Sequence, residues 1–505
     1  MLEAPSRGQL IPVRRESVVA FIGSAPRGPT GIPVAIRTVE DYRRRFGVPG
    51  HRSRVQDLLA QFFDNGGTNA ICVRVAGSDR RHRIVMSGIA GDLVLHAINP
   101  GPHECLRASV DYDAIPDGEE DRFNLVIHRL MSRDRPIVEE QEIYRAVSVD
   151  PRDPDFILHA LVDSELVQVV APIPLMRPDV TRCPGVEVGG SYEYADDDWR
   201  DVTALNDYDL IGCNTEGTGL FALDRVAIVD MLCLVPDHDE VGPVALFAAE
   251  RYCRERQSLL FCDPPAKWVN VGEVVRDRLA SAYSSPNVVT YFPRPVARPG
   301  SGLNRSPSAL GAFVGCLAAE DVRHGVWSQR ATFDIRCRVN LAATLDEHDR
   351  AALRRLGVNA LRECFGGYAQ STGLVTMERS SGLAAGWSDM RRRRLCLFVT
   401  GSIARATRWA SFVDDIELAW TDLRAQVEEF MSALFDAGAL PGGAGAKEAW
   451  YVTRDCELGG DPGTTDFIVG MALEEGQFMA FRFAHDRLEC RVHPVAWQPG
   501  IALAS

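Results

Sequence analysis

The run Gly212–Gly219 is the first stretch whose residue types could do chemistry, because the backbone amides of a glycine-rich loop can bind phosphate. It reads Gly-Cys-Asn-Thr-Glu-Gly-Thr-Gly. This spacing matches neither GxxxxGK[ST] nor GxGxxG, and no lysine follows. We interpret the run as a turn, and we predict no nucleotide or other cofactor.

Histidine and serine could supply a metal ligand, a general base or a nucleophile. A zinc protease needs two histidines one helical turn apart with a glutamate between them, and the eleven histidines include no such pair. His324 could act as a base, but no nucleophile or acid lies at a recognisable interval. Ser402 lacks the GxSxG pattern and is a better candidate for a helix N-cap. We therefore predict no catalytic, cofactor or metal-binding residue, and no enzyme.

The thirteen cysteines are scattered singly, with no CxxC pair. Several lie in apolar runs, as in Ile71-Cys72-Val73 and Leu395-Cys396-Leu397. Buried free thiols in a reducing compartment explain this pattern. The N-terminal residues are polar and broken by proline and glycine, without the apolar core of a signal peptide. We expect a protein that is made in a cytoplasm.

Composition narrows the function further. The chain has 505 residues, of which 46% are hydrophobic and 25% charged, so it is long enough for several cores. A net charge of −14 argues against a nucleic-acid partner. The longest apolar run, Val226–Val235, is interrupted by Asp230 and is too short to cross a bilayer. No direct membrane insertion is expected.

The densest basic cluster consists of six arginines near one apolar run: Arg391, Arg392, Arg393, Arg394, Arg405 and Arg408. The segment Arg394–Ala410 reads as an apolar strand, a small-residue turn and a short helix. The four consecutive arginines could be a solvated run before that strand. A local positive patch in an acidic chain instead suits an acidic protein partner, and this interpretation is favoured.

The elements that must position these residues begin with an α/β pattern. Val18–Gly23 and Ala70–Val75 read as buried strands. Thr38 begins one helix as its N-cap, and Val55–Phe63 forms a second with one apolar face. Strand, helix, helix and strand predict an α/β layer.

From about residue 80 to 198 the pattern changes to short alternating runs with turns between them. Leu93–Ala97, Leu106–Tyr112 and Phe123–His128 show the period of two that predicts antiparallel strands. Phe156–Leu166 reads as the one helix of this β domain. The segment Arg177–Arg200 stays unassigned.

The α/β pattern returns from Leu210, and a last unit follows from about Leu383. The predicted strands are Ala227–Val235, Leu259–Cys262, Asn287–Phe292, Ala449–Thr453, Asp466–Ala472 and Gln477–Phe483. The predicted helices are Val244–Ser258, Glu273–Tyr283, Ser308–Glu320, Asp346–Leu356 and Ile416–Phe435.

The fold class is therefore α/β multidomain, with discontinuous α/β domains, an inserted antiparallel β domain and extended terminal arms. The predicted ranges are 1–16 for an N-terminal arm, 17–80 and 201–382 for a middle domain, 81–200 for the insert, 383–484 for a C-terminal α/β domain and 485–505 for a second arm. The second arm, His485–Ser505, has no partner strand of its own in this prediction. An unpaired strand is a liability unless another chain covers it.

The chain resembles the contractile tail sheath proteins of phage tails and phage-like injection particles. The matching segments occur in the family's order: Val19–Pro29, Asp41–Gly47, Phe62–Val75, Asp263–Pro265, Gly325–Trp327, Leu356–Asn359, Arg394–Trp409 and Phe478–Phe483. No single segment would suffice, but their order and spacing over residues 19–483 make the resemblance specific.

The resemblance implies a structural subunit that stacks as sixfold rings around an inner tube and contracts. It implies strand exchange between copies through the terminal arms. The candidate residues for that exchange are Leu10, Ile11, Val13, Val492, Val495 and Trp497. It places the C-terminal domain against the tube, so the six arginines become candidate tube contacts. Further implied partners are baseplate and terminator proteins, with assembly in a bacterial cytoplasm.

Two departures keep an alternative open. The N-terminal arm is short and lacks the Pro-Gly-Val-Tyr opening often seen in the family, and about twenty residues follow the closing strand. A sheath-like baseplate or tail-terminator component would also fit these altered ends. The sequence does not decide between a phage and a bacterial injection device.

Overall fold

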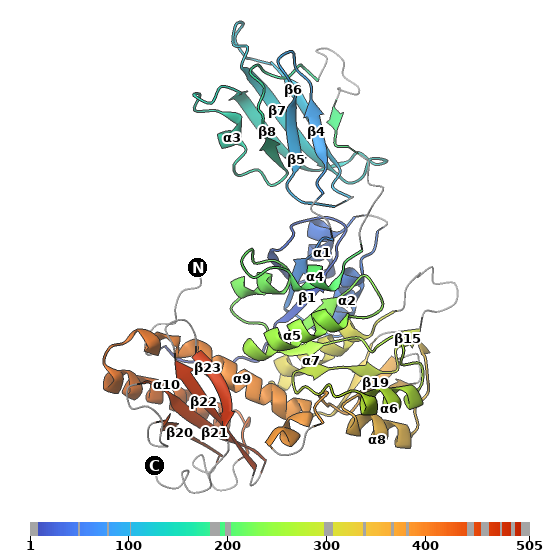
Figure 1. Ribbon diagram of the computed structural model, residues 1–505, viewed down its shortest axis with the longest axis vertical. Coiled ribbons are helices and arrows are strands. Elements are labelled where there is room, and N and C mark those ends of the chain that lie inside the picture. The colour runs from blue at the N-terminus through green and yellow to red at the C-terminus, as the bar shows by residue number, and fades with distance from the viewer. Residues whose placement is uncertain are drawn as a thin grey trace.

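A computed structural model describes residues 9–48, 51–77, 80–101, 103–181, 192–196, 204–296, 307–336, 340–364, 368–379, 383–441, 449–455, 464–474, 477–485 and 490–495. The chain forms an inserted β domain, a central α/β body and a C-terminal α/β unit (Figure 1). The insert stands at one end of the body, and the C-terminal unit lies beside the other end.

The body is built on a six-stranded sheet with the order β13-β12-β11-β1-β3-β2. All neighbours pair in parallel except β2, the antiparallel edge strand. The strands are β1 (Val19–Gly23), β2 (Pro33–Ile36), β3 (Ala70–Arg74), β11 (Met231–Val235), β12 (Leu259–Phe261) and β13 (Val288–Val289). The strands of this sheet are apolar at nearly every position, with Arg74 of β3 as the exception, because helices cover both faces of the sheet.

One face packs against α1 (Val39–Phe46), α2 (Arg54–Asp64) and α7 (Leu310–His324). The other packs against α4 (Asp207–Ile211), the 3-10 helix η1 (Gly219–Arg225) and α5 (Pro243–Glu255). Gly311 and Gly315 let α7 approach α2 closely, because a Cβ at either position would collide with the α2 backbone. The predicted α/β layer is confirmed.

A smaller layer completes the body. Its sheet has the order β14-β18-β19-β16, and β15 pairs with β17 beside it. The strands are β14 (Tyr291–Phe292), β15 (Pro295–Val296), β16 (Thr332–Ile335), β17 (Asn340–Leu341), β18 (Asn359–Cys364) and β19 (Tyr368–Thr372). Two helices, α6 (Val271–Ala280) and α8 (Glu347–Arg355), pack near this layer.

The strands of the insert pair antiparallel. The insert pairs a three-stranded sheet, β4-β5-β9, with a four-stranded sheet, β10-β6-β7-β8, around one apolar core. The strands are β4 (Arg83–Met86), β5 (Leu93–Ala97), β6 (Leu106–Asp111), β7 (Arg122–Leu130), β8 (Val138–Ser148), β9 (Val167–Val170) and β10 (Glu193–Tyr194). The predicted helix Phe156–Leu166 is wrong in length: α3 covers only Ile157–Ala160, because Val167 begins a strand soon after.

Buried charges hold the insert on the body. The Arg74 guanidinium donates to the carbonyls of Ala25 at 3.0 Å and Pro100 at 2.6 Å, and it also reaches Gly28. Glu104 of the insert accepts from the Gly28 amide at 3.1 Å. Each of these carbonyl or carboxylate oxygens accepts a hydrogen bond from a donor that would otherwise be buried without a partner. The junction between the insert and the body is therefore a polar network.

The C-terminal unit packs two helices, α9 (Met390–Ala406) and α10 (Ile416–Asp436), on a four-stranded antiparallel sheet. Its strands follow the chain in order: β20 (Trp450–Arg454), β21 (Phe467–Glu474), β22 (Gln477–His485) and β23 (Cys490–Val495). Two 3-10 helices, η2 (Leu383–Ser388) and η3 (Arg408–Phe412), flank α9.

Two predictions for this unit are wrong. The segment Arg394–Val399 is not a strand, because it lies inside the continuous helix α9. The second arm is not unpaired, because β23 pairs antiparallel with β22 from His485↔Cys490 to Ala480↔Val495. The sheet therefore continues past the predicted boundary at residue 484.

Candidate functional site

The helix α9, which crosses from the body to the C-terminal unit at a seam between them, carries five of the six predicted arginines. Met390 and Leu397 of α9 belong to the core of the body, whereas Leu395 and Phe398 belong to the core of the C-terminal unit. One helix is therefore shared by two hydrophobic cores. Its N-cap is Asp389, whose carboxylate accepts from the Arg391 amide at 2.9 Å.

Ser402 is not the predicted N-cap. It lies inside α9 and is buried. Its neighbour Gly401 lets α9 approach Gln257, because a Cβ there would lie 3.1 Å from the Gln257 Cβ. The hydroxyl of Thr400 donates to Gln257 Oε1 at 2.8 Å. The predicted small-residue turn is thus a helix-packing surface.

The four consecutive arginines point in four directions because successive helical residues are rotated by about 100°. Arg391 donates to the Asp389 carboxylate at 2.6 Å and to the Gln329 carbonyl at 2.9 Å. Arg392 pairs with Glu474. Both side chains are about a quarter exposed.

Arg393 and Arg394 are buried. Arg393 donates to Asn287 Oδ1 at 2.7 Å, and its guanidinium lies 4.5 Å from the centre of the Trp387 ring. Burial lowers the pKa of Arg393 to about 10. The interpretation of the four arginines as a solvated run is therefore wrong for these two.

Arg394 forms a buried ion pair with Asp321 near the end of α7. The same carboxylate accepts from the Ser17 hydroxyl at 2.5 Å. Burial raises the pKa of Asp321, although the Arg394 charge opposes that shift. The Asp321 carboxylate therefore links α7 of the body to α9, through Arg394, and to the segment that follows the N-terminal arm, through Ser17.

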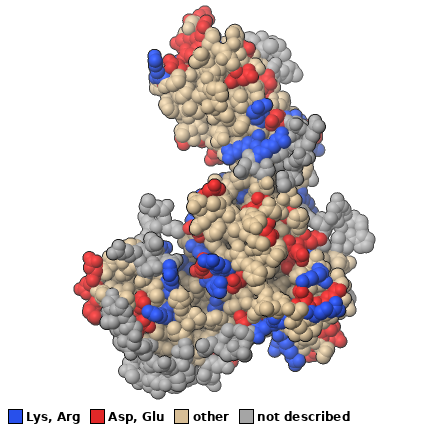
Figure 2. All heavy atoms as spheres, in the orientation of Figure 1, with Lys and Arg blue, Asp and Glu red and all other residues tan. Residues whose placement is uncertain are grey.

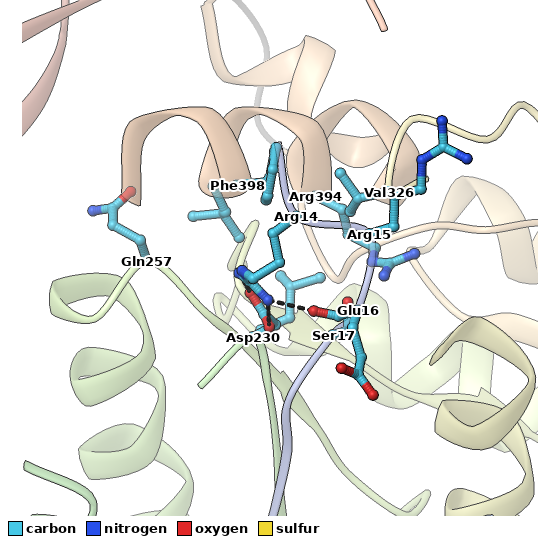
Figure 3. Close-up of a pocket in the computed structure, with 11 residues that line it drawn as sticks. Arg14, Arg15, Glu16, Ser17, Asp230, Gln257, Val326, Arg394 and Phe398 are labelled. Carbon is cyan, nitrogen blue, oxygen red and sulfur yellow. Dashed lines mark hydrogen bonds and ion pairs between the residues drawn. The ribbon is translucent and has the colours of Figure 1, made fainter. Parts of the chain in front are cut away.

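A second ion pair fastens the arm nearby. Arg14 donates to both oxygens of Asp230, at 2.7 and 2.8 Å, and Asp230 also accepts from the Val18 amide at 2.8 Å. The Arg14 guanidinium lies 5.6 Å from the centre of the Phe398 ring on α9. Figure 3 shows Arg14 between α9 and Asp230. The cavity there is about 20 Å³, which is room for a single water molecule.

Arg405 and Arg408 lie beyond these pairs. Arg405, in the last turn of α9, is half-buried and makes no hydrogen bond or ion pair with any described residue. Burial lowers its pKa to about 10, and the nearby charge of Arg14 acts in the same direction. Arg408 is exposed on η3. The structure thus brings Arg405 to the seam and leaves Arg408 on the surface.

The strand-exchange candidates fall into three environments. Leu10 is 63% exposed, whereas Ile11 is buried in the C-terminal core and Val13 is half-buried against it. Val492 and Val495 are half-buried on β23, opposite Phe483 and Ala480. Trp497 lies outside the described residues.

Asp230, Asp321, Arg14 and Ser17 are the seam residues that sequence reasoning missed. The one available signal is a carboxylate next to an apolar run, since Asp230 interrupts Val226–Val235 and Asp321 follows the apolar part of α7. A lone buried carboxylate implies a partner but does not identify it.

Side chains of the types that bind metal ions are dispersed over the described part of the chain. No group of three or more His, Cys, Asp or Glu side chains there could hold a metal ion. His324 is exposed at the end of α7, 4.0 Å from Glu320. Within the same residues, no helix is long and apolar enough to span a bilayer.

Comparison with known proteins gives a fold and no close relative. No family model matches the sequence, and no curated protein matches it. The structure is similar to a sheath tail protein of Listeria innocua, with a TM-score of 0.60 and 11% identity over 95% of this chain and 94% of that one. It is also similar to a sheath tail protein of Desulfitobacterium hafniense, with a TM-score of 0.54 and 10% identity over 98% of each chain.

A third similar structure is the sheath complex of the extracellular contractile injection system PVC in its contracted state. Its TM-score is 0.51, with 13% identity over 99% of this chain and 92% of that one. The similarity in all three cases extends over nearly the whole of both chains. The protein therefore has the tail sheath fold, and the fold that the sequence resemblance implied is confirmed.

Proposed function

We propose that the chain is the structural subunit of a contractile sheath, which polymerises as stacked rings around an inner tube and drives that tube through a target envelope. The observation that supports this most strongly is the whole-length similarity to a sheath tail protein, covering 95% of this chain and 94% of the other. The role is mechanical, so the subunit needs contact surfaces and no catalytic centre.

The seam fits such a role because it makes the body and the C-terminal unit move together. A helix that belongs to two cores cannot rotate in one without disturbing the other, since packed cores are not continuously deformable. The Arg394–Asp321 and Arg14–Asp230 pairs join the same elements. Contraction would then change the contacts between subunits and keep each subunit rigid.

We also propose that neighbouring subunits exchange strands through the ends of the chain, using shorter segments than the whole arms. Ile11 and β23 are already held by their own chain, so the exchanging segments would be those beyond them. Leu10 is 63% exposed and would be accessible to a neighbour. Strand addition would use the unpaired side of an edge strand.

Fewer arginines remain as candidates for contacts with the tube. Arg408 is exposed and Arg391 and Arg392 are partly so, whereas Arg393 and Arg394 are buried. An acidic tube surface could reach only the exposed arginines. Replacing Arg393 or Arg394 would chiefly test the stability of the subunit.

Electron microscopy of the purified protein tests the proposed function. A sheath subunit should form helical tubes of stacked rings, and isolated monomers under all conditions would contradict the proposal. The alternative, a baseplate or terminator component, predicts single closed rings that do not stack.

A further inference from the structure

The outward face of α5 carries two exposed apolar side chains, Val244 and Phe247. Val244 is 45% exposed and Phe247 is 56% exposed, three residues further along the same face. Phe247 meets Tyr283 edge-to-face, with ring centroids 5.2 Å apart. Tyr208, which is 73% exposed, follows Asp207, whose carboxylate accepts from the Val244 amide at 3.1 Å. These side chains form one exposed apolar surface at the start of α5.

The same face becomes basic toward the end of α5. Arg251 and Arg254 continue the stripe by helical spacing, and their side chains are 74% and 61% exposed. Arg256 follows, and Arg405 approaches it from α9. Two glutamates lie beside these arginines. Glu255 forms an exposed pair with Arg251 at 2.9 Å, which contributes little, and the largely buried Glu250 lies 3.6 Å from Arg254.

Figure 2 shows basic side chains gathered where the last turn of α5 meets α9. We call this surface, from Val244 to Arg254, the α5 stripe. The end of the α5 stripe that carries Arg251 and Arg254 is basic, in contrast to the whole chain, which has a net charge of −14.

The connection between α9 and α10 has the complementary composition. Phe412 is 69% exposed and Leu418 is 45% exposed. Between them, Asp414, Asp415 and Glu417 are all exposed. Figure 2 shows acidic side chains along the outer edge of the C-terminal unit, where α10 lies. We call Phe412–Leu418 the acidic connection.

We propose that the acidic connection of one copy docks on the α5 stripe of a second copy. Phe412 and Leu418 would cover Val244 and Phe247, while Asp414 faces Arg251. Opposite charges would set the register of the two surfaces, and the apolar side chains would supply the buried area. This inference rests on the proposed function, because it assigns the surfaces through which sheath subunits would meet.

The geometry of such a contact favours polymers. Its two surfaces are different parts of the chain, so the contact is heterologous and each copy keeps one free surface of each kind. Heterologous contacts extend into rings or helical filaments, whereas a contact between two identical patches stops at a dimer. A helical sheath needs heterologous contacts.

A charge swap tests the contact. Arg251→Glu and Asp414→Arg each place like charges together, so each variant should raise the protein concentration needed for polymer formation by roughly tenfold or more. Combining the two substitutions restores opposite charges and should recover most of the loss. Assembly is followed by sedimentation velocity and negative-stain microscopy, with thermal unfolding as the check on folding.

Arg43→Glu is the matched control. Arg43 is also an exposed helical arginine, paired with Glu40 on α1, far in the chain from both surfaces. It should assemble like the wild type. Phe412→Ser should weaken assembly without any change in charge.

Three outcomes would overturn the inference. The first is normal assembly of both single variants, and the second is a swap that fails to recover. The third is loss of inner-tube binding with ring formation intact, which would assign the stripe to the tube. Each leaves the proposed function standing, whereas a wild-type protein that never self-associates would contradict both.

Discussion

At Arg394 the ion pair with Asp321 makes a prediction about stability. Both side chains are buried, at 8% and 1% residue exposure. Arg394→Ala would leave the Asp321 carboxylate buried with only the Ser17 hydroxyl, at a cost of roughly 3–5 kcal/mol in the free energy of unfolding. Urea unfolding followed by tryptophan fluorescence measures this cost.

The control replaces both partners. Arg394→Met with Asp321→Leu removes both buried charges and should recover most of the lost stability, because apolar residues of similar volume can substitute for a buried pair. If the single variant loses less than about 1 kcal/mol, the pair does not hold the seam.

We expect the stability of the protein to depend on pH through His103, which lies at the junction of the insert and the body. Its ring lies 4.2 Å from that of His51, and burial lowers its pKa to about 4, with His51, His82 and Arg74 acting in the same direction. An unfolded histidine has a pKa near 6.5. Between these two values the unfolded chain binds a proton that the folded chain does not, so stability falls as pH drops from about 6.5 toward 4.

His103→Gln cannot be protonated, so its unfolding temperature should fall less steeply than that of the wild type between pH 7 and pH 4.5. Equal slopes for the two proteins would mean that His103 does not carry this dependence.

At the seam, the sequence draws attention to the arginines of α9 but not to the residues with which they pair. Six arginines stood out from spacing alone, yet Arg394 meets a residue 73 positions away and Arg14 meets one 216 positions away. Local patterns carry no information about pairs at that separation. The tertiary contact decides whether an arginine is a surface charge or an internal link.

At the scale of elements, α9 shows why a buried helix was mistaken for a strand. Leu395–Val399 is apolar at every position because two cores cover the helix from different sides, so the usual polar face is missing. A short apolar run without that face has no period that separates helix from strand. In β23, Pro494 weakens the strand pattern, but an edge strand tolerates it.

The arms make a prediction at the same scale. Removing residues 1–8 leaves Ile11 and Arg14 in place, and removing 496–505 leaves β23 paired with β22. Both truncated proteins should therefore keep the wild-type unfolding temperature but lose the ability to form tubes, because a retained end as short as Leu10 could not form an exchanged strand without the removed segment. Circular dichroism and electron microscopy report the two properties separately. Tubes formed by either truncated protein would exclude exchange through that end.

Over the whole molecule, the mixed α/β class predicted from the sequence is confirmed, with several sheets arranged in an α/β body, an antiparallel β unit and a C-terminal α/β unit (Figure 1). Turn residues and changes of period mark those units in the sequence. The packing of the C-terminal unit on the body through α9 and the N-terminal arm was not predictable, because it depends on contacts between distant segments.

We propose that this protein forms a sheath that shortens by rearranging rigid subunits. Cryo-electron microscopy of the assembled particle before and after triggering tests it most directly. We expect a shorter and wider sheath in which each subunit keeps α9 packed in both cores and keeps the Arg394–Asp321 pair. A sheath of unchanged length, or a shortened one in which α9 has left either core, would contradict it.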